Sequence, residues 1–278
     1  MKGRPSPPST RSFDSAPATA RSASGNRNTA TFAVSTESNP DPGVPGNRSE
    51  SRVAVLTGAS GGLGRATARA LVDMGFKVAL VARDAGRLDA LVADLGAESA
   101  LAVSADISVW SEIDNAMALV AERWGRIDLV IANAGVAGTT SFVSDRGLHP
   151  SEWADMVRTN VLGTALTARG AMPHLLRSSG QLILIGSVAG TITRPGSMYS
   201  VTKWAVAQLA ESIRAETTNT DVRVCLLNPG VIDTDLLRED LRSQPSLAPD
   251  QLARVLTDVI EQPYEINEIT IRPRGAAH

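Results

Sequence analysis

The stretch VAVLTGASGGLGRATARALVDMG, residues 53–75, decides the fold. Its first five residues are mostly β-branched or apolar, which is typical of a strand buried on both faces. Glycines 58, 62 and 64 follow, and then a segment with helical periodicity. Glycines between a strand and a helix let backbone amides approach a pyrophosphate, whose charge the helix N-terminus favours. This placement predicts a dinucleotide-binding turn.

The alternation of strand and helix continues to the end of the chain. Short runs rich in Val, Ile and Leu are typical of buried strands, and helix-length segments separate them. The expected helices are 62–74, 85–95, 109–124, 151–177, 198–218 and 248–261. Seven strands alternating with helices predict an α/β fold, a single Rossmann-type doubly wound parallel sheet with helices on both faces. Residues 51–278 contain no second composition boundary, so we expect one domain that carries both the cofactor and the substrate site.

The first fifty residues have a different composition. Residues 1–50 hold 7 of the 15 prolines, many Ser and Thr, and no regular periodicity. Such a segment buries too little apolar surface to offset its ordering entropy, so we expect a disordered extension. Because its first thirty residues contain five basic residues and one acid, an organelle transit peptide is an alternative, as is a start codon assigned too far upstream.

Composition excludes several classes of protein. The net charge is −2 and there is no long basic run, so we expect no nucleic-acid partner. No apolar run approaches the roughly 18 residues of a membrane span, and we expect no membrane association. The single cysteine, Cys225, lies in an apolar run and is expected to be a buried thiol, which suits a reducing compartment such as the cytoplasm. His149 and His174 have no partner at metal-like spacing, so no metal site is expected.

The end of the second strand predicts the choice of cofactor. An acid there would bond the adenosine ribose hydroxyls and repel a 2′-phosphate, whereas an arginine would pair with that phosphate. Ala82 occupies the strand end and Arg83 follows it, which favours NADP(H) over NAD(H). Asp84 leaves an alternative open, because it would serve the ribose if the loop were shifted by one or two residues.

Polar residues follow the later strands, where open α/β sheets bind their ligands. They are NAG at 133–135, Ser187 after QLILIG, and NPGVIDT at 228–234. Tyr199 and Lys203 then lie four residues apart, on the same face of the helix that follows Ser187. Together with an asparagine in MVRTNVLGT, Asn160, these residues are expected to surround one pocket.

These motifs together resemble the short-chain dehydrogenase/reductase family. The shared elements are TGxxxGxG, NAG, an asparagine in the next helix, YxxxK with a serine twelve residues before the tyrosine, and PGxxxT, and they cover about residues 52–273. The ending IEQPYEINEITIRP further resembles NADP-dependent members that act on 3-hydroxy acids, serine and small carbonyls. The resemblance implies an NADP(H)-dependent oxidoreductase that interconverts a small ketone or aldehyde and its alcohol. It also implies a homodimer or homotetramer, assembled through helices 109–124 and 151–177 and, in a tetramer, also through the last helix and strand.

The resemblance implies a role for each catalytic residue. Tyr199 would donate a proton to the carbonyl oxygen or remove it, which requires a lowered phenol pKa. Lys203 would supply that lowering by its charge and would hold the nicotinamide ribose. Ser187 would hydrogen-bond the substrate oxygen. Asn160 would anchor a water that links Lys203 to solvent.

The resemblance also implies the residues that contact the cofactor. Asp106 would meet the adenine amino group, and residues 133–135 would flank the adenosine half. Pro229 and Gly230 would form the wall behind the nicotinamide, and Thr234 would bond its carboxamide. The full expected set is Gly58, Ser60, Gly62, Leu63, Gly64, Arg83, Asp106, Ile107, Asn133, Ala134, Gly135, Tyr199, Lys203, Pro229, Gly230, Val231, Ile232 and Thr234.

Other functions and the substrate stay open at this point. A catalytically idle NADP(H)-binding sensor or scaffold has the same fold, but it would be expected to lose the tyrosine or the lysine. A sugar epimerase or dehydratase fits less well, because only about 40 residues follow Thr234. We expect a small substrate in an open cleft bounded by 136–140, 188–197 and the stretch after 234. Arg194 and Arg238 are either carboxylate partners or solvated charges.

Overall fold

The computed structural model describes residues 51–235, 237 and 242–275. The expected N-terminal extension and Arg238 lie outside these residues. Among the helices of this part of the chain, none is both long and apolar enough to cross a membrane.

The described residues form a seven-stranded parallel sheet in the order β3-β2-β1-β4-β5-β6-β7, which confirms the expected fold class. The strand order reverses between β1 and β4, and ligands of open α/β sheets bind at such a reversal. The strands are β1 Val53–Thr57, β2 Lys77–Ala82, β3 Ala100–Ser104, β4 Leu129–Ala132, β5 Gln181–Ile185, β6 Arg223–Pro229 and β7 Glu268–Ile271.

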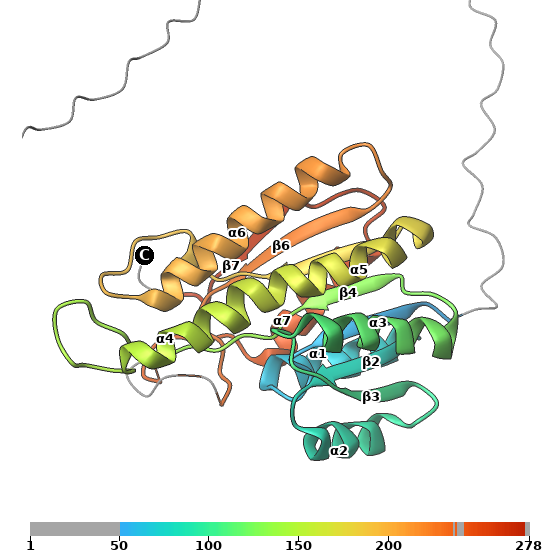
Figure 1. The fold of residues 1–278 in the computed structure, drawn as a ribbon, viewed down its shortest axis with the longest axis horizontal. Helices are drawn as coiled ribbons and strands as arrows, with labels where there is room; N and C mark the ends of the chain where they lie inside the picture. The colour runs from blue at the N-terminus through green and yellow to red at the C-terminus, as the bar shows by residue number, and fades with distance from the viewer. Residues whose placement is uncertain (1–50, 236, 238–241, 276–278) are drawn as a thin grey trace, which may run out of the picture. The chain divides into compact units, whose positions relative to one another are not determined.

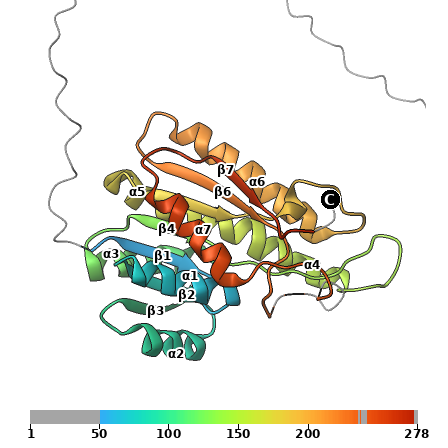
Figure 2. The ribbon, with the colours of Figure 1, turned by 180° about the vertical axis from the view of Figure 1, so that it is seen from behind.

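Helices cover both faces of the sheet. In Figure 1 α3, α5 and α6 lie in front of the strands, and Figure 2 shows α1 and α7 on the opposite face. The α-helices are α1 Gly62–Asp73, α2 Ala85–Leu95, α3 Trp110–Trp124, α4 Pro150–Val157, α5 Thr164–Ser178, α6 Met198–Thr217 and α7 Pro249–Glu261. Two further segments are the π-helix η1 Arg158–Gly163 and the 3-10 helix η2 Val188–Gly190.

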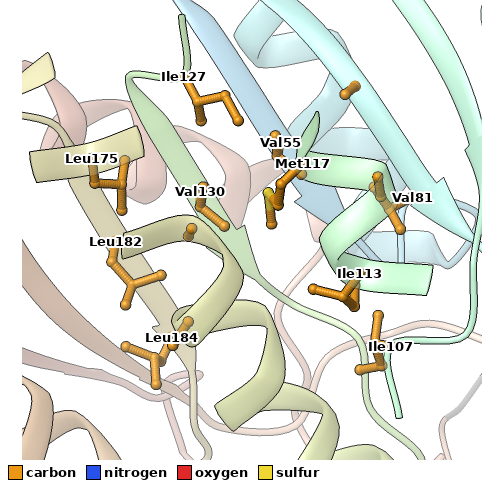
Figure 3. Close-up of a cluster of buried hydrophobic side chains, with 14 of the residues drawn as sticks. Val55, Val81, Ile107, Ile113, Met117, Ile127, Val130, Leu175, Leu182 and Leu184 are labelled. Atoms are coloured by element: carbon orange, nitrogen blue, oxygen red, sulfur yellow. The ribbon is translucent and has the colours of Figure 1, made fainter. Parts of the chain in front are cut away.

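Successive strand residues supply two separate hydrophobic cores. Val55 faces the layer of α3 and α5, where it belongs to a cluster with Met117 and Leu175 (Figure 3). Its neighbour Leu56 faces the layer of α1, α2 and α7. Because side chains alternate across a strand, a strand buried on both faces must be apolar throughout. Cys225 lies in the second cluster, buried as expected, and burial raises the pKa of its thiol to about 11.

The expected helix 151–177 was wrong in one respect. The structure divides it into α4, the π-helical η1 and α5. A π-helix bonds i to i+5 and accommodates one extra residue, and such segments often occur at functional sites. In η1 the Asn160 amide is turned toward the backbone of Val136, and Gly163 lies so close to Ile107 that a Cβ would be 2.5 Å from its Cδ1. These contacts are tertiary, and the helical pattern does not predict them.

Candidate active site

The turn between β1 and α1 requires its glycines. Gly58 has φ +66°, and a Cβ there would lie 2.7 Å from the Cα of Ala134. A Cβ at Gly64 would lie 2.2 Å from the Gly58 oxygen, and one at Gly62 would lie 2.8 Å from Cγ2 of Thr234. No side chain of the described residues caps α1 after Gly61. The amides of the first helical turn are therefore available to an anionic ligand, and the turn fits a pyrophosphate.

A cleft of about 570 Å³ opens at the carboxyl ends of the strands. Every residue of the expected cofactor set lines it, and so do Ser187 and Arg194. The fold thus brings together residues from positions 58 to 234 that the sequence separates widely. Asn160 is not among the described residues that line the cleft.

Two arginines rather than one lie close to the end of β2, Arg83 in the loop and Arg87 in the first turn of α2. Arg83 and Arg87 both line the cleft. Asp84, which left the cofactor choice open, caps α2: its Oδ1 accepts a bond of 3.0 Å from the Arg87 amide, and its Oδ2 lies 3.3 Å from Arg87 Nε. The sequence analysis missed Arg87, although its i+4 spacing from Arg83 at the start of a helix was a usable signal.

Asp106 lies beside Arg83 at the same end of the cleft. Partial burial raises the pKa of its carboxyl. Hydrogen bonds from Ser108 and the charge of Arg83 together lower the pKa by more than burial raises it, so the pKa lies below its usual value. Oδ1 accepts bonds of 2.8 Å from both the amide and the hydroxyl of Ser108. The carboxylate is therefore ionised and held in a fixed orientation at neutral pH.

The NAG motif is tied to the glycine turn through Thr57. The Thr57 hydroxyl accepts bonds from the amides of Asn133 (3.1 Å) and Ala134 (3.2 Å). The Asn133 side chain donates to the carbonyls of Thr57 (2.9 Å) and Gly58 (3.2 Å). These bonds join the ends of β1 and β4, where the strand order reverses. Asn133 thus lines the cleft while its amide group holds the turn.

Ser187 is placed by a buried asparagine. Its amide donates to Oδ1 of Asn228 (3.0 Å), whose Nδ2 in turn donates to Glu268 (2.7 Å). Gly186 makes room for this contact, since a Cβ there would be 2.0 Å from Asn228 Oδ1. The Ser187 hydroxyl accepts from the Ala189 amide (3.1 Å). Asn228 is fully buried, and the sequence analysis gave it no role.

Tyr199 lies in the first turn of α6. Thr140 fixes this turn, because its hydroxyl accepts from the Met198 amide (2.8 Å) and donates to the Gly196 carbonyl (2.5 Å). Burial raises the pKa of the Tyr199 phenol above 10.0, while interaction with Ser187 and the charge of Arg194 oppose that rise. The direction differs from the lowered pKa that the sequence analysis expected.

Lys203 lies behind Tyr199 on the same face of α6. Its Nζ is 5.9 Å from the Tyr199 ring centroid and donates to the Ile185 carbonyl (2.8 Å). Lys203 is only 5% exposed, and burial lowers the pKa of its ammonium to about 8. The charge is bonded to the backbone, and it is not among the interactions that oppose the rise of the Tyr199 pKa, which come from Ser187 and Arg194.

Asn160 lies outside the cleft and bonds to the backbone of Val136, which lines it. Its Oδ1 accepts from the Val136 amide (2.8 Å), and its Nδ2 donates to the Val136 carbonyl (2.8 Å) and the Thr202 hydroxyl (3.0 Å). A Cβ at Gly135 would be 3.3 Å from Asn160 Oδ1 and 3.7 Å from Lys203 Nζ, so these groups lie close together. The Asn160 amide is fully bonded within the protein, and its expected water relay stays a prediction.

Comparisons with known proteins agree with this geometry. Residues 52–245 match the family described as short chain dehydrogenase. An uncharacterized oxidoreductase of Staphylococcus aureus is 34% identical over 227 residues, which are 80% of this chain and 97% of the relative. An alcohol dehydrogenase from the archaeon Thermococcus sibiricus, solved with 5-hydroxy-NADP, has a TM-score of 0.74 and 29% identity over 82% of this chain and 99% of its own. A 3-ketoacyl-(acyl-carrier-protein) reductase from Brucella melitensis, solved with NADH, has a TM-score of 0.73 and 27% identity over 80% and 97%.

The fold and the cleft define an NAD(P)-dependent oxidoreductase that acts on CH–OH groups. Because the family match spans more than half of the sequence, this chain belongs to the short-chain dehydrogenase family.

Proposed function

We propose that the protein is an NADP(H)-dependent oxidoreductase that interconverts a small ketone or aldehyde and its alcohol, with Tyr199 as general acid and base. One observation carries the proposal: a single cleft contains the glycine turn, Ser187, Tyr199 and Lys203. A bound nicotinamide would supply or accept the hydride. The glycine turn and the first turn of α1 would hold its pyrophosphate, and Lys203 its ribose.

The chain's own residues supply the proton chemistry. The Tyr199 hydroxyl donates a proton to the carbonyl oxygen during reduction, and Ser187 donates a hydrogen bond to the same oxygen. The raised pKa keeps the phenol protonated at neutral pH, which suits the reductive direction. In the oxidative direction the positive charges of Arg194, Lys203 and the oxidised nicotinamide favour phenolate. Asn160 positions the Val136 backbone and bonds to Thr202, the neighbour of Lys203 in the chain.

The preference for NADP(H) is supported by the loop after β2 and the first turn of α2. Arg83 and Arg87 offer two guanidinium groups for a 2′-phosphate, and such pairs are often bidentate. Asp84 would have to give up its helix cap and its ion pair with Arg87 to bond a ribose. Solved relatives carry an NADP derivative in one case and NADH in the other, so this choice must be measured on the protein itself.

The alternative is a catalytically idle NADP(H)-binding sensor with the same fold. Two experiments separate the readings: calorimetric titration with NADPH and NADH, and a panel of small ketones, aldehydes and oxo acids followed by absorbance of the reduced nicotinamide. Tighter binding of NADPH together with turnover of a panel member supports the proposal. Binding without turnover by any member favours the sensor, and failure to bind either cofactor refutes both.

We further propose that residues 51–278 form one domain with both sites, active in the cytoplasm as a homodimer or homotetramer. Large apolar side chains are exposed on the expected interface helices, among them Trp110 (42%) and Leu119 (45%) on α3 and Leu176 (48%) on α5. Light scattering after size exclusion tests the assembly. The narrower resemblance to enzymes of 3-hydroxy acids and serine stays a prediction.

A further inference from the structure

We propose that Arg194 binds a carboxylate of the substrate, so that the enzyme acts on oxo acids and the corresponding hydroxy acids. The inference rests on the proposed function, because it assigns the substrate end of the same cleft.

Arg194 lies next to the reacting groups. It belongs to the loop between Ser187 and Tyr199 and lines the cleft together with both. Its charge is near enough to the Tyr199 phenol to oppose the rise of that pKa. An anionic group bonded to Arg194 would therefore lie within a small molecule's length of the carbonyl that Tyr199 protonates.

The guanidinium of Arg194 is uncommitted within the described part of the chain, which offers it no hydrogen bond or ion pair. The other cation that lines this part of the cleft, Lys203, bonds to the Ile185 carbonyl. Of the lining residues in the range 185–203, only Arg194 and Lys203 are charged. An unpaired, planar set of five donors is suited to a carboxylate, which it binds in a bidentate manner.

The loop fixes the backbone of Arg194 before any ligand binds, while the side chain stays exposed to solvent. The Ser197 amide donates to the Arg194 carbonyl (3.3 Å), with Pro195 and Gly196 (φ +70°) between them. This is the sequence pattern of a type II turn, in which proline pre-sets one dihedral and glycine accepts the positive φ. Thr140 also bonds the Gly196 carbonyl (2.5 Å). A fixed backbone reduces the entropy lost when the side chain engages a ligand.

The charge balance favours a carboxylate over a phosphate. A phosphate monoester carries about −1.5 to −2 charges at neutral pH, whereas a carboxylate carries one. One uncommitted guanidinium neutralises one charge, and the adjacent lining residues Val188 and Ala189 are apolar. A second negative charge at this end of the cleft would find no further unbonded cation among the described lining residues in the range 185–203, because Lys203 bonds to the Ile185 carbonyl.

The test uses complexes that cannot react. The protein is saturated with whichever of NADPH and NADH binds more tightly, and 2-, 3- and 4-hydroxybutanoate and their three amides are titrated by calorimetry. We expect at least one acid to bind about tenfold or more tightly than its amide, since hydrogen bonds to charged groups are worth that much. Arg194→Gln should abolish this preference. Arg146→Gln, which changes an exposed loop arginine that does not line the cleft, should retain it.

Two results would overturn the proposal: equal binding of all three acids and their amides, or a preference for acid that survives Arg194→Gln. Turnover of neutral aldehydes separates this failure from a failure of the proposed function. Oxidation of the reduced cofactor by neutral aldehydes, without any preference for acids, would refute the substrate class and leave the reductase standing. Failure of both cofactors to bind would refute the proposed function and the substrate class together.

Discussion

Replacing Lys203 by methionine should stabilise the protein at neutral pH while abolishing its activity. Lys203 is 5% exposed, and burial lowers the pKa of its ammonium from 10.5 to about 8. That shift corresponds to about 3 kcal/mol of cost to folding when both states are protonated. Methionine removes the cost but leaves the Ile185 carbonyl without its donor, a loss of about 1–2 kcal/mol. The expected net gain at pH 7 is about 1–2 kcal/mol.

The pH dependence isolates the charge from the other changes. Between pH 8 and 10.5 the unfolded chain keeps the Lys203 proton while the folded protein has lost it. The unfolded state therefore binds more protons, and the stability of the wild type rises with pH in this window. From pH 7 to 9.5 the unfolding free energy of the wild type should gain about 2 kcal/mol relative to Lys203→Met.

Urea unfolding of both proteins at pH 7 and 9.5 measures this difference, and effects of all other groups cancel in the comparison unless they couple to Lys203. Lys77→Met is the control, because Lys77 is only half-buried at the start of β2 and its Nζ likewise donates to a backbone carbonyl, that of Glu98. Its substitution should leave the pH dependence unchanged. A difference between wild type and Lys203→Met that stays constant across the two pH values would refute the reasoning.

Three further substitutions test the cofactor and catalytic sites. Tyr199→Phe should retain nicotinamide binding and lose about 100-fold or more in turnover, because only the proton donor is removed; wild-type turnover would exclude the assigned role. Arg87→Ala should weaken NADPH binding about tenfold and leave NADH unchanged by calorimetry; equal losses would mean that Arg87 does not contact the 2′-phosphate. Gly64→Ala places a Cβ 2.2 Å from the Gly58 oxygen, so thermal unfolding should show a loss of about 1–3 kcal/mol together with weaker cofactor binding. An unchanged melting temperature would contradict that steric argument.

The fold could be predicted from sequence because its signals are local. A strand buried on both faces is almost entirely apolar, as β1 and β5 are apart from Thr57 and Gln181, and the glycine turn marks where β1 meets α1. Each signal lies within about twenty residues. The π-helical η1 was not predicted, and the bonds that its Asn160 side chain makes with the amide and carbonyl of Val136 join residues 24 positions apart.

Some features of the candidate site could likewise be predicted from the sequence, and others could not. Of the four catalytic residues expected from the sequence motifs, Ser187, Tyr199 and Lys203 line the cleft and Asn160 does not. The sequence did not predict which hydrogen-bond partners the side chains choose. Asp84 caps α2, and Asn228 accepts a hydrogen bond from the Ser187 amide. The pKa of Tyr199 was missed for a related reason. Burial of the phenol is a property of the packed structure, and spacing from Lys203 contains no information about it.

The π-helical η1 gives this part of the chain a tolerance for a change in residue number that the helices on either side lack. Each residue of a helix advances the side-chain direction by about 100°. A deletion within α5 would turn the residues after it by that angle and carry Leu175 out of its core. A deletion within η1 would instead let the segment close as an α-helix, because a π-helix accommodates one residue more than an α-helix. The helices on either side would keep their faces, and the loss would fall on the contacts of Asn160 with Val136 and of Gly163 with Ile107.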